Sequence, residues 1–163
     1  MKYYYLLTAA ASVLGTSATA ADFTAIKIER TANAPIDQTW KRIGAFCALR
    51  DWLAPMTCDI TSGGDFEIGS VRSIDKGRRV EVMVGMSKYS YAYTYIVPEP
   101  TLYHGQVEAI ADGPNKTKII YSVIYDQDPK GNAEAKAAFK ETRAKQFVPY
   151  VETMVKLAEG KKP

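Results

Sequence analysis

The sequence is poor in the residues that build metal centres and imidazole or thiol active sites. Its 163 residues include one histidine, His104, and two cysteines, Cys47 and Cys58. Zinc sites usually recruit several cysteine or histidine ligands at short spacing, so the composition argues against a metal. A catalytic cysteine would need a base, and His104 is the only histidine that could serve. We expect no metal, and no cofactor either, because no cofactor-binding motif is present.

Residues 1–20 have the order of a secretory signal peptide. Lys2 is the only charge before Asp22, an apolar core follows it, and the stretch ends in small residues up to Ala20. The alternative is a membrane anchor, but a spanning helix needs about 20 predominantly apolar residues, and several serines and threonines interrupt this one. We expect cleavage between Ala20 and Ala21, with export to the periplasm or the medium.

The mature chain, residues 21–163, is expected to form one domain without a membrane span. Without Lys2 the 21 basic residues fall to 20, against 18 acidic ones, which gives a formal net charge of +2. The basic residues are spread along the chain, which argues against a nucleic-acid partner. Two short basic groups, residues 76–79 and 161–162, are typical of a turn and a solvated end, or of weak docking to an acidic protein.

The two cysteines are an even number in a chain expected outside the cytoplasm, which favours a disulfide over two free thiols. A bridge between Cys47 and Cys58 would close a short loop and stabilise the fold by about 3 kcal/mol. Whether it forms depends on the distance between the two Cα atoms.

The pattern of apolar residues predicts an α+β fold. Residues 23–31 alternate as a strand does, and Pro35 introduces a short helix, which a second short helix over residues 46–53 follows. Turn signals then separate six strand-like runs, which is typical of an antiparallel meander. These runs are residues 57–61, 69–74, 79–84, 89–97, 102–110 and 116–126.

A long helix is predicted over residues 133–159. Asn132 is a good N-cap, and the apolar residues at helical intervals include Phe147 and Val151. Pro149 cannot donate a hydrogen bond to the Lys145 carbonyl, so we expect a kink or a break there.

Tyrosines alternate along one predicted strand, so their rings should share one face: Tyr89, Tyr91, Tyr93 and Tyr95. Tyr121 and Tyr125 alternate in the same way two strands later. The rings either coat an exposed face or line the interior beneath the long helix. Buried phenol hydroxyls need partners, which favours a partly polar interior suited to a small, largely apolar ligand. A solid core is the alternative.

Arg72 and Glu81 lie on neighbouring strand-like runs joined by a short turn, so they are expected to face each other across an antiparallel pair. Such a pair is more often structural than functional. The functional alternative makes Arg72 a polar anchor for a ligand oxygen and Glu81 its orienting partner.

The order of elements resembles the helix-grip fold of the SRPBCC superfamily, which includes START and Bet v 1-like proteins. The residues look most like the bacterial polyketide cyclase/dehydrase branch. The matching pieces are Ala34-Pro35 with Trp40, Trp52 with Pro55, Gly69 with Arg72, Glu81, Tyr95 before Pro98 and Pro100, Tyr103, and Thr117 followed by Tyr121 and Tyr125.

This resemblance implies a curved antiparallel sheet of about seven strands, two short helices, and a long C-terminal helix over a cavity. Members use the cavity to bind hydrophobic ligands and, in some cases, for ring closure or dehydration. Arg72 and Glu81 would be the polar pair in it. The sequence departs from the usual pattern at Ser87 and Tyr121, which argues against shared catalytic chemistry.

Three functions therefore compete. The first is a periplasmic binding protein for a small hydrophobic molecule, held among Trp52, Tyr91, Tyr93, Tyr95, Tyr121, Phe147 and Val151. The second is a cofactor-independent cyclase or dehydratase in which Glu81 moves a proton and Arg72 steadies an oxyanion. The third is an accessory protein that docks on a periplasmic complex.

Overall fold

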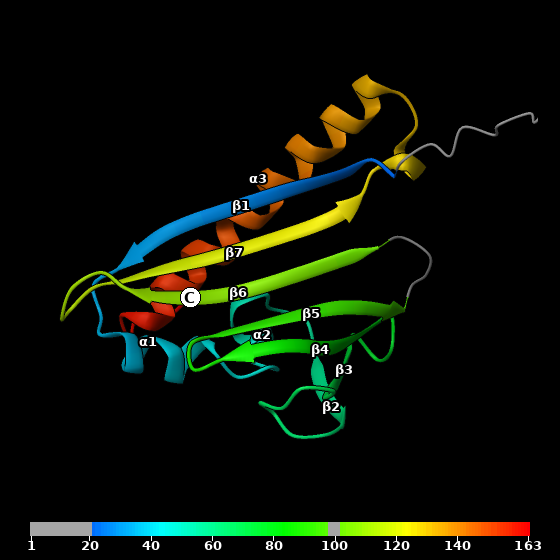
Figure 1. The fold of residues 1–163 in the computed structure, drawn as a ribbon. Helices are drawn as coiled ribbons and strands as arrows, with labels where there is room; N and C mark the ends of the chain where they lie inside the picture. The colour runs from blue at the N-terminus through cyan, green and yellow to red at the C-terminus, as the bar shows by residue number, and fades with distance from the viewer. Residues whose placement is uncertain (1–20, 98–101) are drawn as a thin grey trace, which may run out of the picture.

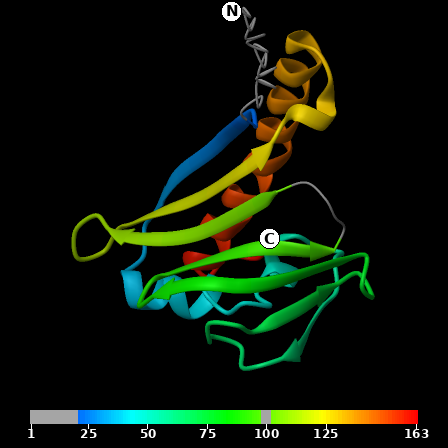
Figure 2. The same cartoon turned by 45° about the vertical axis from the view of Figure 1, so that its right-hand side comes forward.

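The computed structural model describes residues 21–97 and 102–163, so the predicted signal peptide, residues 1–20, lies outside the described residues. The described chain forms one curved sheet with helices on one of its faces (Figures 1 and 2). The strands are β1 (Phe23–Ala32), β2 (Cys58–Ser62), β3 (Val71–Ile74), β4 (Arg79–Ser87), β5 (Ser90–Val97), β6 (Tyr103–Ala111) and β7 (Thr117–Asp126).

All seven strands are antiparallel to their neighbours, in the order β1-β7-β6-β5-β4-β3-β2. Consecutive strands from β2 to β7 are neighbours, which confirms the predicted meander. The first strand lies beside the last, with Phe23 opposite Asp126 and Ala32 opposite Thr117. With a long helix across the inner face, this arrangement is the predicted α+β helix-grip fold.

The two short helices are α1 (Ile36–Ile43) and α2 (Leu49–Trp52). Helix α2 begins later than the predicted residue 46, and hydrogen bonds explain the difference. The Phe46 amide donates to the Asp65 carbonyl at 3.1 Å, and the Cys47 amide donates to the Asp65 carboxylate at 3.3 Å. These amides are therefore satisfied by a loop rather than by a helical turn.

The long helix α3 (Ala133–Ala158) packs its C-terminal half on the sheet. Its buried residues recur at intervals of three and four, which makes one continuous stripe: Phe147, Val151, Met154 and Ala158. The Asn132 side chain accepts a hydrogen bond from the Ala135 amide at 2.9 Å, so the predicted N-cap is confirmed. The first turns of α3 project past the core, as Figure 1 shows.

Helix α3 continues through Pro149, so the predicted alternative of a break is wrong. Pro149 and Lys145 are both exposed residues on the solvent side of the helix. The lost backbone hydrogen bond therefore costs little, since water can replace it.

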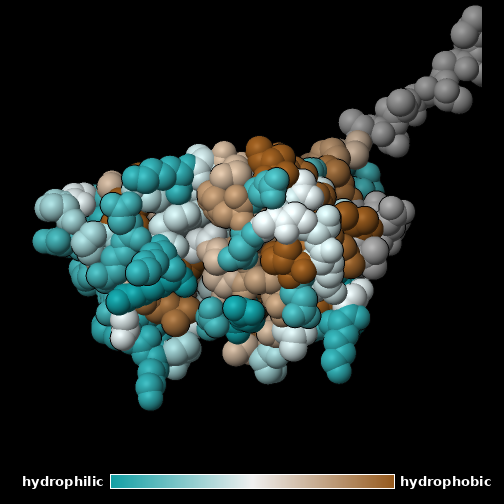
Figure 3. Space-filling model, turned by 90° about the horizontal axis from the view of Figure 1, so that it is seen from below, coloured by the Kyte–Doolittle hydropathy of each residue, from teal (hydrophilic) through white to brown (hydrophobic). Residues whose placement is uncertain are grey.

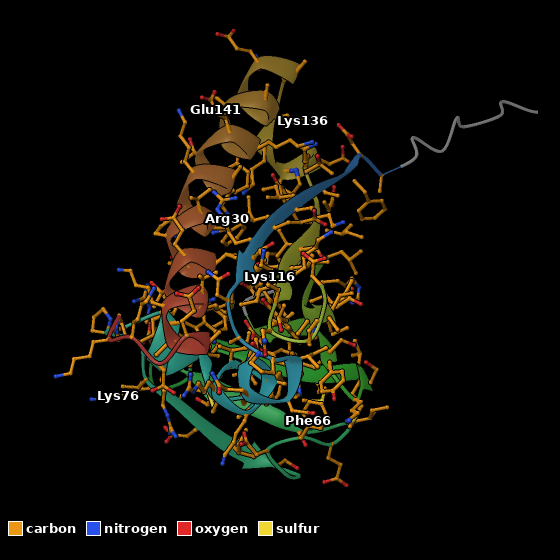
Figure 4. All side chains as sticks on the ribbon, turned by 90° about the vertical axis from the view of Figure 1, so that its left-hand side faces the viewer. Arg30, Phe66, Lys76, Lys116, Lys136 and Glu141 are labelled. Atoms are coloured by element: carbon orange, nitrogen blue, oxygen red, sulfur yellow. A yellow bond between two sulfur atoms is a disulfide. The ribbon has the colours of Figure 1, made fainter. Side chains whose placement is uncertain are left out.

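Ion pairs and carbonyl contacts hold α3 in place over the sheet. Arg30 of β1 lies 3.7 Å from Glu152, and Lys136 lies 2.9 Å from Asp22 at the start of the described chain (Figure 4). Arg42 of α1 donates to the Ala158 carbonyl at 2.6 Å, where a cation suits the end of a helix. These contacts fix the helix that covers the inner face.

Cys47 and Cys58 form the predicted disulfide, with their Cα atoms 5.5 Å apart. The bridge ties the segment before α2 to the first residue of β2. Neither cysteine is exposed by more than 7%. Among the helices in the described ranges, none is long and apolar enough to cross a membrane.

Candidate functional site

The predicted row of tyrosines lies on the inner face of the sheet. Tyr91 and Tyr93 on β5 are 0% and 3% exposed, and Tyr95 is half-buried at the far end of the strand. Tyr89 lies outside the strand, in the turn after β4. Its hydroxyl donates to Asp37 of α1 at 2.5 Å. Three of the four predicted rings therefore lie on the strand, and the Tyr89 ring lies just before it.

Rings from three strands meet beneath α3. Tyr93 lies 6.2 Å from Tyr91 and 6.3 Å from Tyr103 between ring centroids, and Tyr103 stacks on Tyr95 at 4.0 Å. Tyr121 on β7 donates to or accepts from Tyr93 through their hydroxyls, 2.8 Å apart. We call these five residues, Tyr91, Tyr93, Tyr95, Tyr103 and Tyr121, the tyrosine cluster.

The helices cover the tyrosine cluster with the residues predicted for that role. Trp52 of α2 lies 6.0 Å from the Tyr121 ring, and Phe147 of α3 lies 5.2 Å from it. Val151 is fully buried in the same core. The structure therefore brings every predicted ligand-binding residue into one region; their role in binding a ligand stays a prediction.

Several polar atoms near the cluster are buried without a hydrogen-bond partner among the described residues, and the indole Nε1 of Trp52 is one of them. The hydroxyl of Tyr91 lies beside the Arg72 guanidinium. Buried donors of this kind are normally paired, and leaving one unpaired costs about 1 to 3 kcal/mol. The core thus contains hydrogen-bonding capacity that its own side chains do not use.

Burial keeps the phenols of the tyrosine cluster neutral. Desolvation raises the pKa of Tyr93 and Tyr103 well above the ordinary value, and it raises the pKa of Tyr121 as well. For Tyr91, desolvation is again the main cause, and the positive charge of Arg72 offsets part of it. At neutral pH these groups can donate or accept hydrogen bonds but cannot act as bases.

Arg72 and Glu81 face each other across β3 and β4, as predicted. Both side chains are 1% exposed. Arg72 Nε donates to Glu81 Oε2 at 2.7 Å, and Nη2 lies 2.5 Å from the same oxygen. Its Nη1 donates to the carbonyl of Phe46. All three guanidinium nitrogens are therefore engaged within the protein.

Aromatic rings enclose the Arg72 guanidinium. Its central carbon lies 4.1 Å from the Phe46 ring centroid and 4.6 Å from that of Tyr93. Burial is the largest single influence on the pKa of Arg72 and lowers it, but the charge of Glu81 and the neighbouring Tyr91 and Tyr93 together raise it by more, so the net shift is upward. Sequence reasoning missed Phe46, because its contact with Arg72 depends on a loop that packs under the sheet.

A pocket of about 280 Å³ opens at the Tyr95 end of the tyrosine cluster. Its walls come from the segment before β2, the turn between β3 and β4, β5, and α3. The lining residues are Met56, Asp75, Arg78, Arg79, Tyr95 and Arg143. Of these only Tyr95 was predicted as a site residue. The run Arg78-Arg79 was noted as a basic turn, but no sequence signal linked it to Arg143.

His104 lies on β6 between the inward-facing Tyr103 and Gly105, opposite Thr94 and Ile124. It therefore points to the outer face of the sheet, away from the tyrosine cluster. The described residues contain no group of three or more histidine, cysteine, aspartate or glutamate side chains placed to hold a metal ion.

Solved structures similar to this one have the same fold. A protein from Thermobifida fusca matches with a TM-score of 0.71 at 14% identity, over 85% of this chain and 97% of its own. An aromatase/cyclase from Streptomyces matches with 0.66 at 16%, over 85% and 94%. Norcoclaurine synthase from Thalictrum flavum, in complex with dopamine and hydroxybenzaldehyde, matches with 0.62 at 14%, over 95% and 99%.

No curated protein sequence matches the chain significantly. The sequence model of one family, described as polyketide cyclase / dehydrase and lipid transport, matches residues 24–155. That range includes the sheet except for Phe23, together with the tyrosine cluster and most of α3. The chain therefore belongs to the polyketide cyclase/dehydrase and lipid transport family.

Proposed function

We propose that this protein binds a small, largely apolar molecule in the periplasm, between the tyrosine cluster and α3. The observation that carries the proposal is the pocket of about 280 Å³ at the Tyr95 end of the tyrosine cluster, which α3 lines through Arg143. A ligand with a ring and one or two oxygen atoms would pack on the Tyr95 ring and place its oxygen atoms near the polar groups of the pocket.

The periplasmic location is part of the proposal. The Cys47–Cys58 disulfide supports it, because such bonds persist in oxidising compartments and are rare in the cytoplasm. The signal-like order of residues 1–20 supports it independently.

Native mass spectrometry of protein isolated from the periplasm tests the binding function. We expect a complex heavier than the mature chain by the mass of a small molecule, and we expect the delipidated protein to recapture single-ring compounds from a panel. An unliganded protein that also binds nothing in the panel would contradict the proposal.

Two tyrosine variants sharpen this test. Tyr95→Leu removes the aromatic wall of the pocket, so it should weaken ligand binding. Tyr89→Phe changes a hydroxyl outside the pocket and should leave binding unchanged. Equal binding by wild type and Tyr95→Leu would show that the Tyr95 ring does not contact the ligand.

Docking on another protein is the second candidate function. Large apolar residues on the outer side of the sheet are 41% to 50% exposed at one end, which favours a contact surface: Phe23, Ile96, Leu102 and Ile124. In the view of Figure 3, apolar side chains gather toward one side and polar ones cover the opposite end. A pull-down from periplasm at low and moderate salt would separate docking from ligand binding.

A catalytic role for Glu81 has less support. Its carboxylate lies within 4 Å of two guanidinium groups, with Arg72 on Oε2 and Arg79 3.8 Å from Oε1. A proton-transfer group needs a free oxygen directed at the substrate. The catalytic alternative can be tested with a candidate substrate. If Glu81→Gln loses turnover while an equally destabilised core variant retains it, Glu81 is catalytic.

A further inference from the structure

The pocket beside Tyr95 has an excess of positive charge. Arg78, Arg79 and Arg143 line it, and among the described residues Asp75 is the only carboxylate in its wall. Asp75 also accepts a hydrogen bond from the Thr57 amide at 3.2 Å, which holds it on the turn. A concave site with uncompensated guanidinium groups attracts an anion.

The arginines of this pocket are poorly matched by carboxylates of the protein. Arg79 has only the distant Glu81 Oε1, at 3.8 Å, and the other oxygen of that carboxylate is held by Arg72. Within residues 21–97 and 102–163, neither Arg78 nor Arg143 has a carboxylate oxygen within 4 Å. The pocket therefore presents positive charge that the described part of the chain does not neutralise.

Arg143 carries the second, independent observation. Its Nε is buried and has no hydrogen-bond partner among the described residues, while Nη1 donates to Gln146 at 3.2 Å. The guanidinium carbon lies 5.1 Å from the Phe147 ring and 5.9 Å from the Tyr103 ring. Aromatic rings thus hold the group in a partly dry position in which an oxyanion would be its natural partner.

The remaining lining residues are an aromatic ring, Tyr95, and a thioether side chain, Met56. Tyr95 stacks on Tyr103 with an angle of 18° between the rings, and Met56 lies on another side. A volume of about 280 Å³ is close to the lower end of small-molecule sites, which start near roughly 300 Å³. The space suits one aromatic ring rather than a long chain or a fused ring system.

We propose that the ligand is a small aromatic carboxylic acid, whose carboxylate binds Arg79 and Arg143 and whose ring stacks on Tyr95. This inference rests on the proposed binding function and names its ligand class. A guanidinium binds a carboxylate through paired hydrogen bonds. The ring of the ligand would then lie against Tyr95, the outermost member of the tyrosine cluster at this pocket.

Titration calorimetry of the mature protein with phenylacetate and with the neutral phenylacetamide tests the inference. The two compounds differ in charge but share the ring. We expect phenylacetate to bind at least about tenfold more tightly, and we expect acetate, which lacks the ring, to bind at least about tenfold more weakly than phenylacetate.

Matched arginine variants locate the carboxylate. Arg79→Gln and Arg143→Gln should each weaken phenylacetate binding about tenfold and leave phenylacetamide binding unchanged. Arg50→Gln removes an equal charge from the exposed side of α2, outside this pocket, and should change neither affinity. Circular dichroism confirms that the variants keep the fold.

The outcomes separate this inference from the binding function. Equal affinity for the acid and the amide, or an equal loss in Arg50→Gln, would overturn the acid specificity while leaving the binding function in place. Competition by acetate or inorganic phosphate as strong as that by phenylacetate would reduce the pocket to a simple anion site and overturn ring recognition. If no aromatic compound binds, charged or neutral, both proposals fail.

Discussion

Gly105 of β6 lies directly opposite Tyr93 of β5, and the Tyr93 ring occupies the space where a side chain at position 105 would begin. A Cβ at that position would collide with the end of the ring and with its hydroxyl. The absence of a side chain at Gly105 therefore lets Tyr93 lie flat across the next strand, where it meets Tyr121.

We predict that Gly105→Ala destabilises the protein by about 1 to 3 kcal/mol, because the Tyr93 ring must leave its position in a closely packed core. Urea denaturation followed by circular dichroism measures the change. Gly85→Ala is the matched control, since a Cβ there meets only the Ala92 side chain at an ordinary 3.8 Å. Equal effects of the two substitutions would show that the collision is relieved without cost.

The buried Arg72–Glu81 pair gives the second prediction. Glu81→Gln leaves the Arg72 guanidinium buried without its counter-charge, so it should lower the free energy of unfolding by about 3 to 5 kcal/mol. The double variant Arg72→Met/Glu81→Leu removes both charges and should recover most of this loss. Urea denaturation of the single and double variants measures both effects. A double variant no more stable than Glu81→Gln would mean that the attraction between the two charges outweighs the cost of burying them.

Much of this site could be predicted from local sequence, because successive side chains of a strand point to opposite faces of the sheet. The period of two put Tyr91 and Tyr93 on one side, and a short turn was enough to align Arg72 with Glu81. The periodicity of α3 likewise identified Phe147 and Val151 as part of its buried stripe. In each case the determining contacts lie within one element or between sequence neighbours.

The residues that sequence reasoning missed are positioned by tertiary packing. Arg143 reaches the pocket only because α3 crosses the sheet at one particular angle and depth, and Arg79 is a neighbour only through the β3–β4 turn. Phe46 contacts Arg72 because Asp65 hydrogen-bonds the loop that carries it. No local period encodes such contacts between distant segments.

Removal of the Cys47–Cys58 disulfide should lower the stability of the fold. The cysteines lie 11 positions apart in the sequence, and the double variant Cys47→Ser/Cys58→Ser should unfold with a free energy lower by about 3 kcal/mol. Thermal unfolding of oxidised wild type, reduced wild type and the double variant measures it. Wild type in reductant should match the variant; equal midpoints in all three would show that the bridge does not stabilise the fold.

The predicted signal peptide can be tested by measuring at which residue the mature chain begins. Intact-mass analysis of protein from the periplasm should give the mass of residues 21–163 less two hydrogens for the disulfide, which corresponds to cleavage between Ala20 and Ala21. Replacing Ala18 and Ala20 with bulky residues should block processing and retain the precursor, whereas the same change at Ala10 should have little effect. A full-length chain in the cytoplasm would contradict export.

The raised pKa values of the buried phenols predict that stability falls in alkaline solution. Burial raises the pKa of Tyr93, Tyr103 and Tyr121 above the ordinary value of 10.0, so the folded protein keeps these protons at a pH where the unfolded chain releases them. The folded state then binds more protons than the unfolded state. Their contribution to stability is therefore complete below about pH 10 and declines as the pH rises, by up to about 1.4 kcal/mol per pH unit for each tyrosine.

Urea midpoints measured from about pH 8 to about pH 11 test this sign. Tyr121→Phe removes one of the three phenols, so its stability should decline less steeply above about pH 10 than that of wild type. The lost hydrogen bond to Tyr93 lowers the whole curve but does not depend on pH below that point, so the slope isolates the titration. Parallel curves for wild type and Tyr121→Phe would mean that Tyr121 releases its proton as readily in the folded core as in the unfolded chain.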